Sequence, residues 1–150
     1  MSMKMHIFPV IVFVLFLPAT SLVCAADLNQ LYHSDYDAFW KQWREAEAKA
    51  MSCTDHDATA KFLSNAITTL GNTEVSEANA ESIEKLSLND PACLLGSIQR
   101  LQAEEQNKIV GFFIVTPLFH DEEEIRKALE KHWNKYRNIK ELYYRLKQRS

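Results

Sequence analysis

Apolar side chains recur every three or four residues over most of the chain after residue 26, and this pattern predicts helices that each bury one face. The pattern is sustained over residues 28–51, 58–70 and 125–146. With only three glycines and four prolines among 150 residues, the chain lacks the turn residues that a β-sandwich or a barrel uses. We therefore expect an all-α protein, an irregular bundle of about five to six helices.

Capping residues set the expected helix boundaries. Asp27, Thr54 and Asp121 are suited to begin helices, and Asp90-Pro91 places a proline where the first helical turn tolerates it. Gly71 is expected to end the second helix in a left-handed conformation. The predicted helices cover residues 27–52, 54–70, 73–88, 90–101 and 121–147.

Residues 109–115 (IVGFFIV) are apolar throughout, and seven residues are too few for periodicity to separate a buried helix from a buried strand. We favour a helix because no other segment offers a partner strand, and Pro117 ends the segment in either case. The chain contains no internal repeat and no interdomain linker. One helical domain is therefore expected over residues 26–150.

The first 25 residues have the three parts of a secretory signal peptide. Lys4 lies in a short N-terminal region, residues 7–17 form an apolar run, and residues 18–25 are small and polar. The apolar run is shorter than the roughly 20 residues that span a membrane. Cleavage after Ala25 is expected, which predicts a secreted or periplasmic protein. Lipidation of Cys24 and an uncleaved N-terminal anchor remain as alternatives.

Two cysteines, Cys53 and Cys93, follow the predicted cleavage point. In an exported chain they predict one disulfide, and the alternatives are two free thiols or a nucleophilic cysteine. Cys53-Thr-Asp-His56 contains the residue types of half a metal site, but the disulfide is the better use of Cys53. We therefore predict neither a metal nor a cofactor, and no Cys-x-x-Cys-His haem attachment is present.

The charges are divided between two parts of the chain. Residues 26–125 hold 18 acidic and 7 basic side chains, whereas residues 126–150 hold 9 basic and 2 acidic ones. The simpler explanation of the basic end is that bases toward the end of a helix complement its dipole and that a basic face packs beside the acidic body. The alternative is a basic helix that docks on an acidic partner or a membrane surface. The partner-binding candidates are Lys131, Lys135, Arg137 and Arg145.

One short stretch resembles a known family. Leu28-Asn29-x-x-Tyr32, Trp40-x-x-Trp43-Arg44 and the following Cys53 are similar to a pattern in small secreted helical lysozyme inhibitors. The two parts of the pattern lie closer together here than in that family, and Cys53 comes later after the Trp-Arg pair. For these reasons no site residue is transferred from the family.

None of the common catalytic signatures is present, including G-x-S-x-G, the P-loop and H-E-x-x-H. We therefore expect a non-enzymatic, exported protein that binds another protein, as an inhibitor or immunity protein against a hydrolase or toxin does. The first alternative is an envelope-associated protein whose C-terminal helix lies on anionic lipid, without a transmembrane segment in the mature chain. The second is an unrecognised enzyme that uses carboxylates. Nucleic acid is not expected as a partner.

Overall fold

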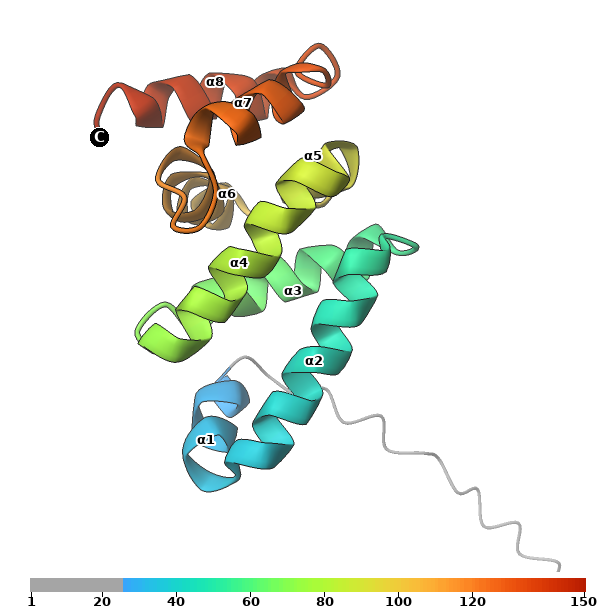
Figure 1. Ribbon diagram of the computed structural model, residues 1–150, viewed down its shortest axis with the longest axis vertical. Helices are drawn as coiled ribbons and strands as arrows, with labels where there is room; N and C mark the ends of the chain where they lie inside the picture. The colour runs from blue at the N-terminus through green and yellow to red at the C-terminus, as the bar shows by residue number, and fades with distance from the viewer. Residues whose placement is uncertain (1–25) are drawn as a thin grey trace, which may run out of the picture.

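The computed structural model describes residues 26–150, all of whose regular structure is helical (Figure 1). The predicted signal peptide, its cleavage point and Cys24 lie outside the described residues. The all-α prediction is confirmed. The elements are α1 (Ala26–Ser34), α2 (Tyr36–Ser52), α3 (His56–Thr68), α4 (Thr73–Asn89), α5 (Pro91–Ile98), α6 (Ala103–Ile109), the π-helix η1 (Val110–Val115), α7 (Glu122–Glu130) and α8 (Arg137–Lys147).

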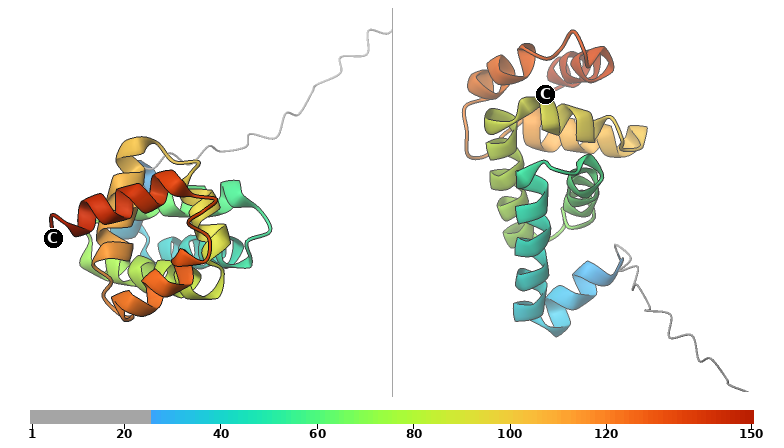
Figure 2. Two further views of the ribbon diagram at one scale, coloured as in Figure 1. Left: turned by 90° about the horizontal axis from the view of Figure 1, so that it is seen from above. Right: turned by 90° about the vertical axis from the view of Figure 1, so that its right-hand side faces the viewer.

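The helices are arranged along one long axis (Figure 1). Helix α1 lies at one end, α7 and α8 lie at the other, and α2 to α6 fill the space between them, as the turned views of Figure 2 also show. Helix α3 packs on α2 and α5, α4 packs on α5 and α7, and α8 covers η1. Buried side chains from α2 through α8 form one continuous core.

Two of the predicted helices are each divided in the structure, so the prediction of five to six helices is wrong. The helix expected over 27–52 is interrupted at Asp35, whose side chain accepts a 3.0 Å hydrogen bond from the Ala38 N–H and begins α2. The helix expected over 121–147 consists of α7 and α8, which are separated by a turn over residues 131–136.

Tertiary packing explains the second interruption. Trp133 and Tyr136 lie in the turn and are only 5% and 4% exposed. The Tyr136 hydroxyl donates a 3.2 Å hydrogen bond to the carbonyl oxygen of Ala92 on α5. The turn therefore buries two large aromatic side chains and lets α7 pack on α4 and α5 while α8 packs on η1.

The segment 109–115 is helical, which confirms the favoured prediction over the strand. Its residues Val110–Val115 form a π-helix that continues from α6. The Thr116 hydroxyl donates a 2.9 Å hydrogen bond to the Gly111 carbonyl oxygen, five residues earlier. Val110, Phe113, Ile114 and Val115 are buried, whereas Phe112 is exposed.

Some of the predicted capping residues are right and others are wrong. Asp90 caps α5 with a 3.0 Å hydrogen bond from the Cys93 N–H, and Pro91 takes the first helical position as expected. Asp55 rather than Thr54 caps α3, by accepting from the Asp57 N–H. Gly71 does not have a left-handed conformation, and α3 has already ended at Thr68.

The predicted disulfide is present between Cys53 and Cys93, with the two Cα atoms 6.2 Å apart. Cys53 follows the last residue of α2 and has a left-handed backbone with φ of 49°. Cys93 lies on α5 and is 3% exposed. The bond therefore ties the end of α2 to α5, next to the start of α3.

Candidate functional site

Glu84, on α4, is a fully buried acidic side chain, with 0% of its surface exposed. The free energy cost of burying a carboxylate is high unless several donors satisfy its oxygens. Glu84 lies next to Ile83, which is also buried. Both residues are therefore on the part of α4 that faces the core. Its partners all belong to residues 118–120, in the connection between η1 and α7.

Three successive backbone N–H groups donate to the Glu84 carboxylate. Oε1 accepts from Leu118 at 2.7 Å, and Oε2 accepts from Phe119 at 2.9 Å and from His120 at 2.8 Å. The His120 ring adds a contact from Nδ1 to Oε2 at 3.2 Å. Hydrogen bonds to a charged group are stronger than those to a neutral group, so this carboxylate fixes the backbone of the whole connection. We call residues 116–121 the anchored loop.

The anchored loop presents apolar side chains to solvent. Leu118 is 65% exposed and Phe119 is 51% exposed, and Phe112 on the preceding η1 is 55% exposed. The described residues contain five large hydrophobic side chains with this degree of exposure, and these three fall within eight consecutive positions. Scattered exposed apolar side chains are normal, but a concentration of them marks an interaction surface. The other two are Tyr36 and Tyr144.

The four predicted partner-binding residues are all exposed, and three of them lie close together in the sequence while the fourth lies further along α8. Lys131 and Lys135 lie in the turn between α7 and α8, and Arg137 begins α8. Arg145 lies eight residues further along α8, which corresponds to about 12 Å along the helix axis and a rotation of about 80°. It also contacts the side chain of Asn107 on α6.

Carboxylates of α7 partly neutralise the basic end of the chain. Glu122 accepts hydrogen bonds from Lys147 and from the hydroxyl of Tyr143, the latter at 2.7 Å. The hydrogen bond from Lys147 lowers the pKa of Glu122 below its ordinary value. Burial and the hydrogen bond to Glu122 raise the pKa of Tyr143. This part of the basic surface therefore packs against acidic side chains, as the simpler interpretation of the charge pattern expected.

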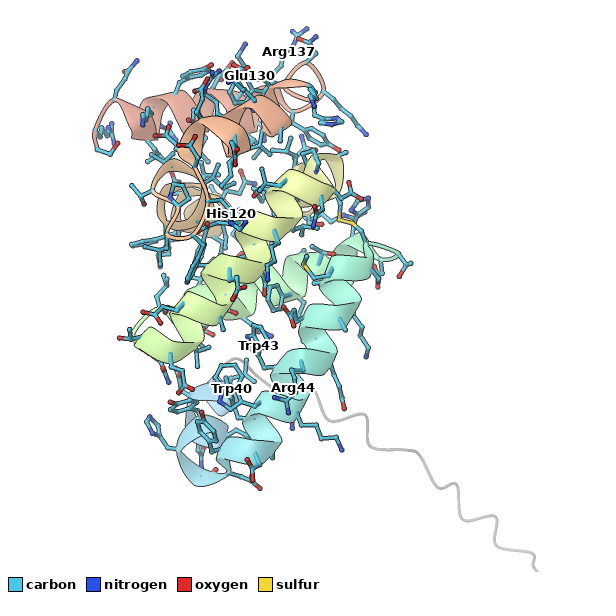
Figure 3. The ribbon with its side chains drawn as sticks, in the orientation of Figure 1. Trp40, Trp43, Arg44, His120, Glu130 and Arg137 are labelled. Carbon is cyan, nitrogen blue, oxygen red and sulfur yellow. A yellow bond between two sulfur atoms is a disulfide. The ribbon has the colours of Figure 1, made fainter. Side chains whose placement is uncertain are left out.

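The tryptophans of the lysozyme-inhibitor pattern are part of the packing at the other end of the molecule (Figure 3). Trp40 packs edge-on against Tyr36, Phe39 and Trp43. The indole N–H of Trp43 donates a 2.9 Å hydrogen bond to the side chain of Asn79 on α4. The hydrogen bond from Trp43 attaches α2 to α4, whereas the aromatic partners of Trp40 all lie on α2 itself, so both side chains take part in packing. Arg44 is exposed on α2.

A groove with a volume of about 690 Å³ lies between α2 and α3, beside this aromatic packing. Apolar side chains such as Phe39, Trp43 and Phe62 are part of its lining. Glu45 is the single acidic side chain in its lining, next to Lys49 and Lys61. A pair of carboxylates, as acid–base catalysis on glycosidic bonds requires, does not line this groove in the described part of the chain.

Over residues 26–150, the regular structure is all helical, one disulfide is present, and an exposed apolar loop is held by a buried carboxylate. No family model, no curated protein and no solved structure matches the chain. Among residues 26–150, no helix is long and apolar enough to cross a membrane. The resemblance to helical lysozyme inhibitors therefore remains a sequence observation over a short stretch.

Sequence reasoning did not find Glu84 or the anchored loop. Glu84 lies in a stretch with Glu74, Glu77 and Glu81, which are acidic residues of the kind that cover helix surfaces. Its partners are backbone groups that carry no signal in the sequence. The apolar run that ends at Pro117 and is followed by Leu118 and Phe119 was the one available sign that hydrophobic side chains continue into a loop.

Proposed function

We propose that this chain is a non-enzymatic, exported protein that binds another protein, and that the anchored loop supplies the apolar centre of the interface. The protein would belong to the class of inhibitors and immunity proteins that act on a hydrolase or toxin in the periplasm or outside the cell. Export is expected from the signal peptide in the sequence. The mature protein would act as a stable, disulfide-bonded scaffold for the loop.

The observation that carries the proposal is the binding of three loop N–H groups by one buried carboxylate. A loop that is already fixed loses little conformational entropy when it binds, and preorganisation of this kind increases affinity. Aromatic and large aliphatic side chains at the centre of an interface supply most of the binding energy. Leu118 and Phe119 are such side chains, and their backbone is fixed by hydrogen bonds. Both are exposed, whereas large apolar side chains of this kind are usually buried in a protein interior.

The charges beside the loop indicate the chemistry of the partner. Asp121 and Glu124 are exposed at the start of α7, and Glu81 on α4 lies close enough to interact with His120. Complementary charge at the rim of an interface steers association and fixes orientation. We therefore expect the partner to have an apolar pocket with basic side chains at its rim.

Membrane attachment through α8 is the first alternative. Ile139, Leu142 and Tyr143 form the apolar side of α8, and they are 2%, 6% and 2% exposed because they pack into the core. A helix that lies in a membrane surface must offer an apolar side to the lipid. Attachment would therefore depend on exposed bases alone, and salt-sensitive flotation with anionic vesicles would support it over a protein partner.

A carboxylate-dependent enzyme is the second alternative. Glu84 accepts from three backbone N–H groups and contacts the His120 ring, and Glu74 accepts hydrogen bonds from Tyr32 and Tyr36 at 2.5 and 2.6 Å. Both carboxylates therefore have structural partners. Activity on peptidoglycan or peptides that disappeared when one other Asp or Glu was changed would favour an enzyme.

The test of the proposal is capture of a partner by tagged protein from periplasmic extract, followed by assay of the captured protein. Four proteins are compared: the wild type, Leu118→Ser with Phe119→Ser, a charge reversal of the four basic candidates, and Tyr144→Ser. Tyr144 is an exposed aromatic residue outside the loop, 39% exposed, and serves as the matched control.

The proposal expects one stoichiometric partner whose hydrolase or toxin activity falls as the wild-type protein is added. The loop variant should lose at least about 2 kcal/mol of binding free energy, the size of effect expected for a central anchor, and Tyr144→Ser should bind normally. If mild crosslinking yields no stoichiometric partner, or if the loop variant binds as tightly as the wild type, the proposal is wrong.

A further inference from the structure

Three side chains with metal-binding atoms meet where α2, α3 and α5 come together. The sulfur atoms of Cys53 and Cys93 and a ring nitrogen of His56 all lie within 4.8 Å of one another. Within residues 26–150, this is the one group of three or more His, Cys, Asp or Glu side chains with such spacing. We propose that reduction of the Cys53–Cys93 disulfide turns this group into a binding site for a thiophilic divalent cation such as Zn²⁺.

The chemistry balances with a dithiol as the reductant. The dithiol loses two electrons and two protons and becomes a cyclic disulfide, while the sulfurs of Cys53 and Cys93 gain them and become thiols. Zinc then replaces the two thiol protons, which pass to solvent. Two thiolates, a neutral imidazole and Zn²⁺ together carry no net charge, so the ion adds no uncompensated charge near buried Cys93.

The backbone already places the three ligands within reach of one ion. Zinc binds thiolates at about 2.3 Å and imidazole at about 2.0 Å, so tetrahedral ligands stand about 3.5–3.8 Å apart. The His56 ring nitrogen lies within 4.8 Å of both sulfurs, and the Cα atoms of the two cysteines are 6.2 Å apart. The sulfurs are bonded to each other before reduction, so rotation about the side-chain bonds then has to move them apart to about 3.8 Å.

Neighbouring groups on α3 and α5 restrain the ligands. The His56 Nδ1 lies 3.4 Å from the hydroxyl of Ser97, which is fully buried, and such contacts orient the ring of a metal-binding histidine. A Cβ at Gly96 would lie 3.4 Å from the His56 ring, so glycine keeps this position open. The Thr59 hydroxyl donates to the Ala50 carbonyl oxygen at 3.1 Å and lies 4.0 Å from the Cys93 sulfur.

One side of the group faces solvent. His56 lines an open groove of about 390 Å³ together with Gln99, Arg100, Lys135 and Tyr136. Water from this groove can supply a fourth ligand to the ion. A site with three protein ligands and one exchangeable position differs from a structural zinc site, in which four protein ligands surround the ion. The bound ion would therefore remain accessible to small ligands.

The test is titration of the reduced and the oxidised protein with Co²⁺, followed by displacement with Zn²⁺. The reduced protein should bind one Co²⁺, with the absorption bands of tetrahedral cobalt and of thiolate-to-cobalt charge transfer, and Zn²⁺ should remove both. The oxidised protein should show neither. Chelator competition then gives the zinc affinity of each variant.

Variants separate a site of three ligands from two thiols alone. His56→Ala should weaken zinc binding more than about 10-fold, and Ser97→Ala should weaken it by a smaller factor. His33→Ala removes an exposed histidine on α1 and is the matched control, with unchanged affinity expected. Equal zinc affinity in the wild type and His56→Ala, or no cobalt binding by the reduced wild type, would overturn the proposal.

Circular dichroism shows whether reduction of the disulfide unfolds the chain. If the reduced protein loses helix, one equivalent of Zn²⁺ should restore it in the wild type, because binding and folding are then coupled. If Zn²⁺ leaves the reduced wild type unfolded, the geometry described above is not formed and the proposal is wrong.

Discussion

Two ties join segments of this chain that are far apart in the sequence, and they use different chemistry. The disulfide joins residues 40 positions apart and restricts the unfolded chain as well as the folded one. Glu84 joins α4 to the anchored loop over 34 to 36 positions, through hydrogen bonds that exist only in the folded state. Loss of the disulfide should therefore lower the stability of the whole domain, whereas loss of the carboxylate should also free one loop.

The largest effect is expected from the disulfide. Cys53→Ser with Cys93→Ser should lower the free energy of unfolding by about 4 kcal/mol, the chain-entropy value for a closed loop of this length. Urea unfolding followed by circular dichroism measures the change. Thiol titration is the control: the native wild type should show no free thiol from these cysteines until it is denatured and reduced. Two reactive thiols in the native exported protein would contradict the pairing.

A smaller loss is expected at Glu84. Glu84→Gln keeps the shape of the side chain but places an NH₂ group opposite backbone N–H donors, so at least one donor loses its acceptor. The free energy of unfolding should fall by about 3 kcal/mol. Hydrogen exchange should also become faster at the amides of Leu118, Phe119 and His120 than at those of α5.

Glu81→Gln is the matched control, because Glu81 lies one turn earlier on α4 and its side chain is 50% exposed. Its ion pair with Lys85 lies on the surface, where solvent screens it, so its removal should leave the free energy of unfolding almost unchanged. Similar losses in the two variants would show that the buried carboxylate has no special role in stability.

The same contrast explains what the sequence could predict. Cysteines in an exported chain have few partners to choose from, so two of them define a disulfide. A glutamate has no such restriction, and Glu84 differs from Glu77 and Glu81 only in its position relative to Ile83 and Leu86. A helix over residues 73–88 was predicted correctly, but partners in a loop more than 30 residues away follow from the assembled fold.

The divided helices have a related explanation. Trp133 and Tyr136 continue the spacing of three and four residues, so the pattern alone predicts one helix through residues 131–136. The break follows from where those rings are buried, against a core that includes α5, and periodicity does not carry that information. The anchored loop was missed for the same reason, since its conformation is set by a distant side chain.

A third tie, between Glu122 and Lys147, should respond to pH. The hydrogen bond from Lys147 lowers the pKa of Glu122, so its contribution is complete above about pH 4.5 and is lost as the pH falls through the lowered value. At neutral pH, Glu122→Gln should cost no more than about 1 kcal/mol, because the pair is partly exposed. Urea unfolding from pH 3 to pH 7 should show the difference from the wild type disappear at the acidic end. A difference that persists at pH 3 would mean that the ion pair is not its source.

The smallest effect is expected at Gly71, in the turn between α3 and α4, which is part of none of the three ties. Its φ is not positive, and an added Cβ would meet no atom within 4 Å. Gly71→Ala should therefore raise the free energy of unfolding by about 0.5 kcal/mol, because alanine restricts the unfolded chain. Gly96→Ala is the contrasting control, because its Cβ would lie 3.2 Å from the Tyr136 hydroxyl oxygen beside the disulfide, and it should destabilise the protein. A loss of stability in Gly71→Ala would instead favour the left-handed conformation that its place after a helical pattern had indicated.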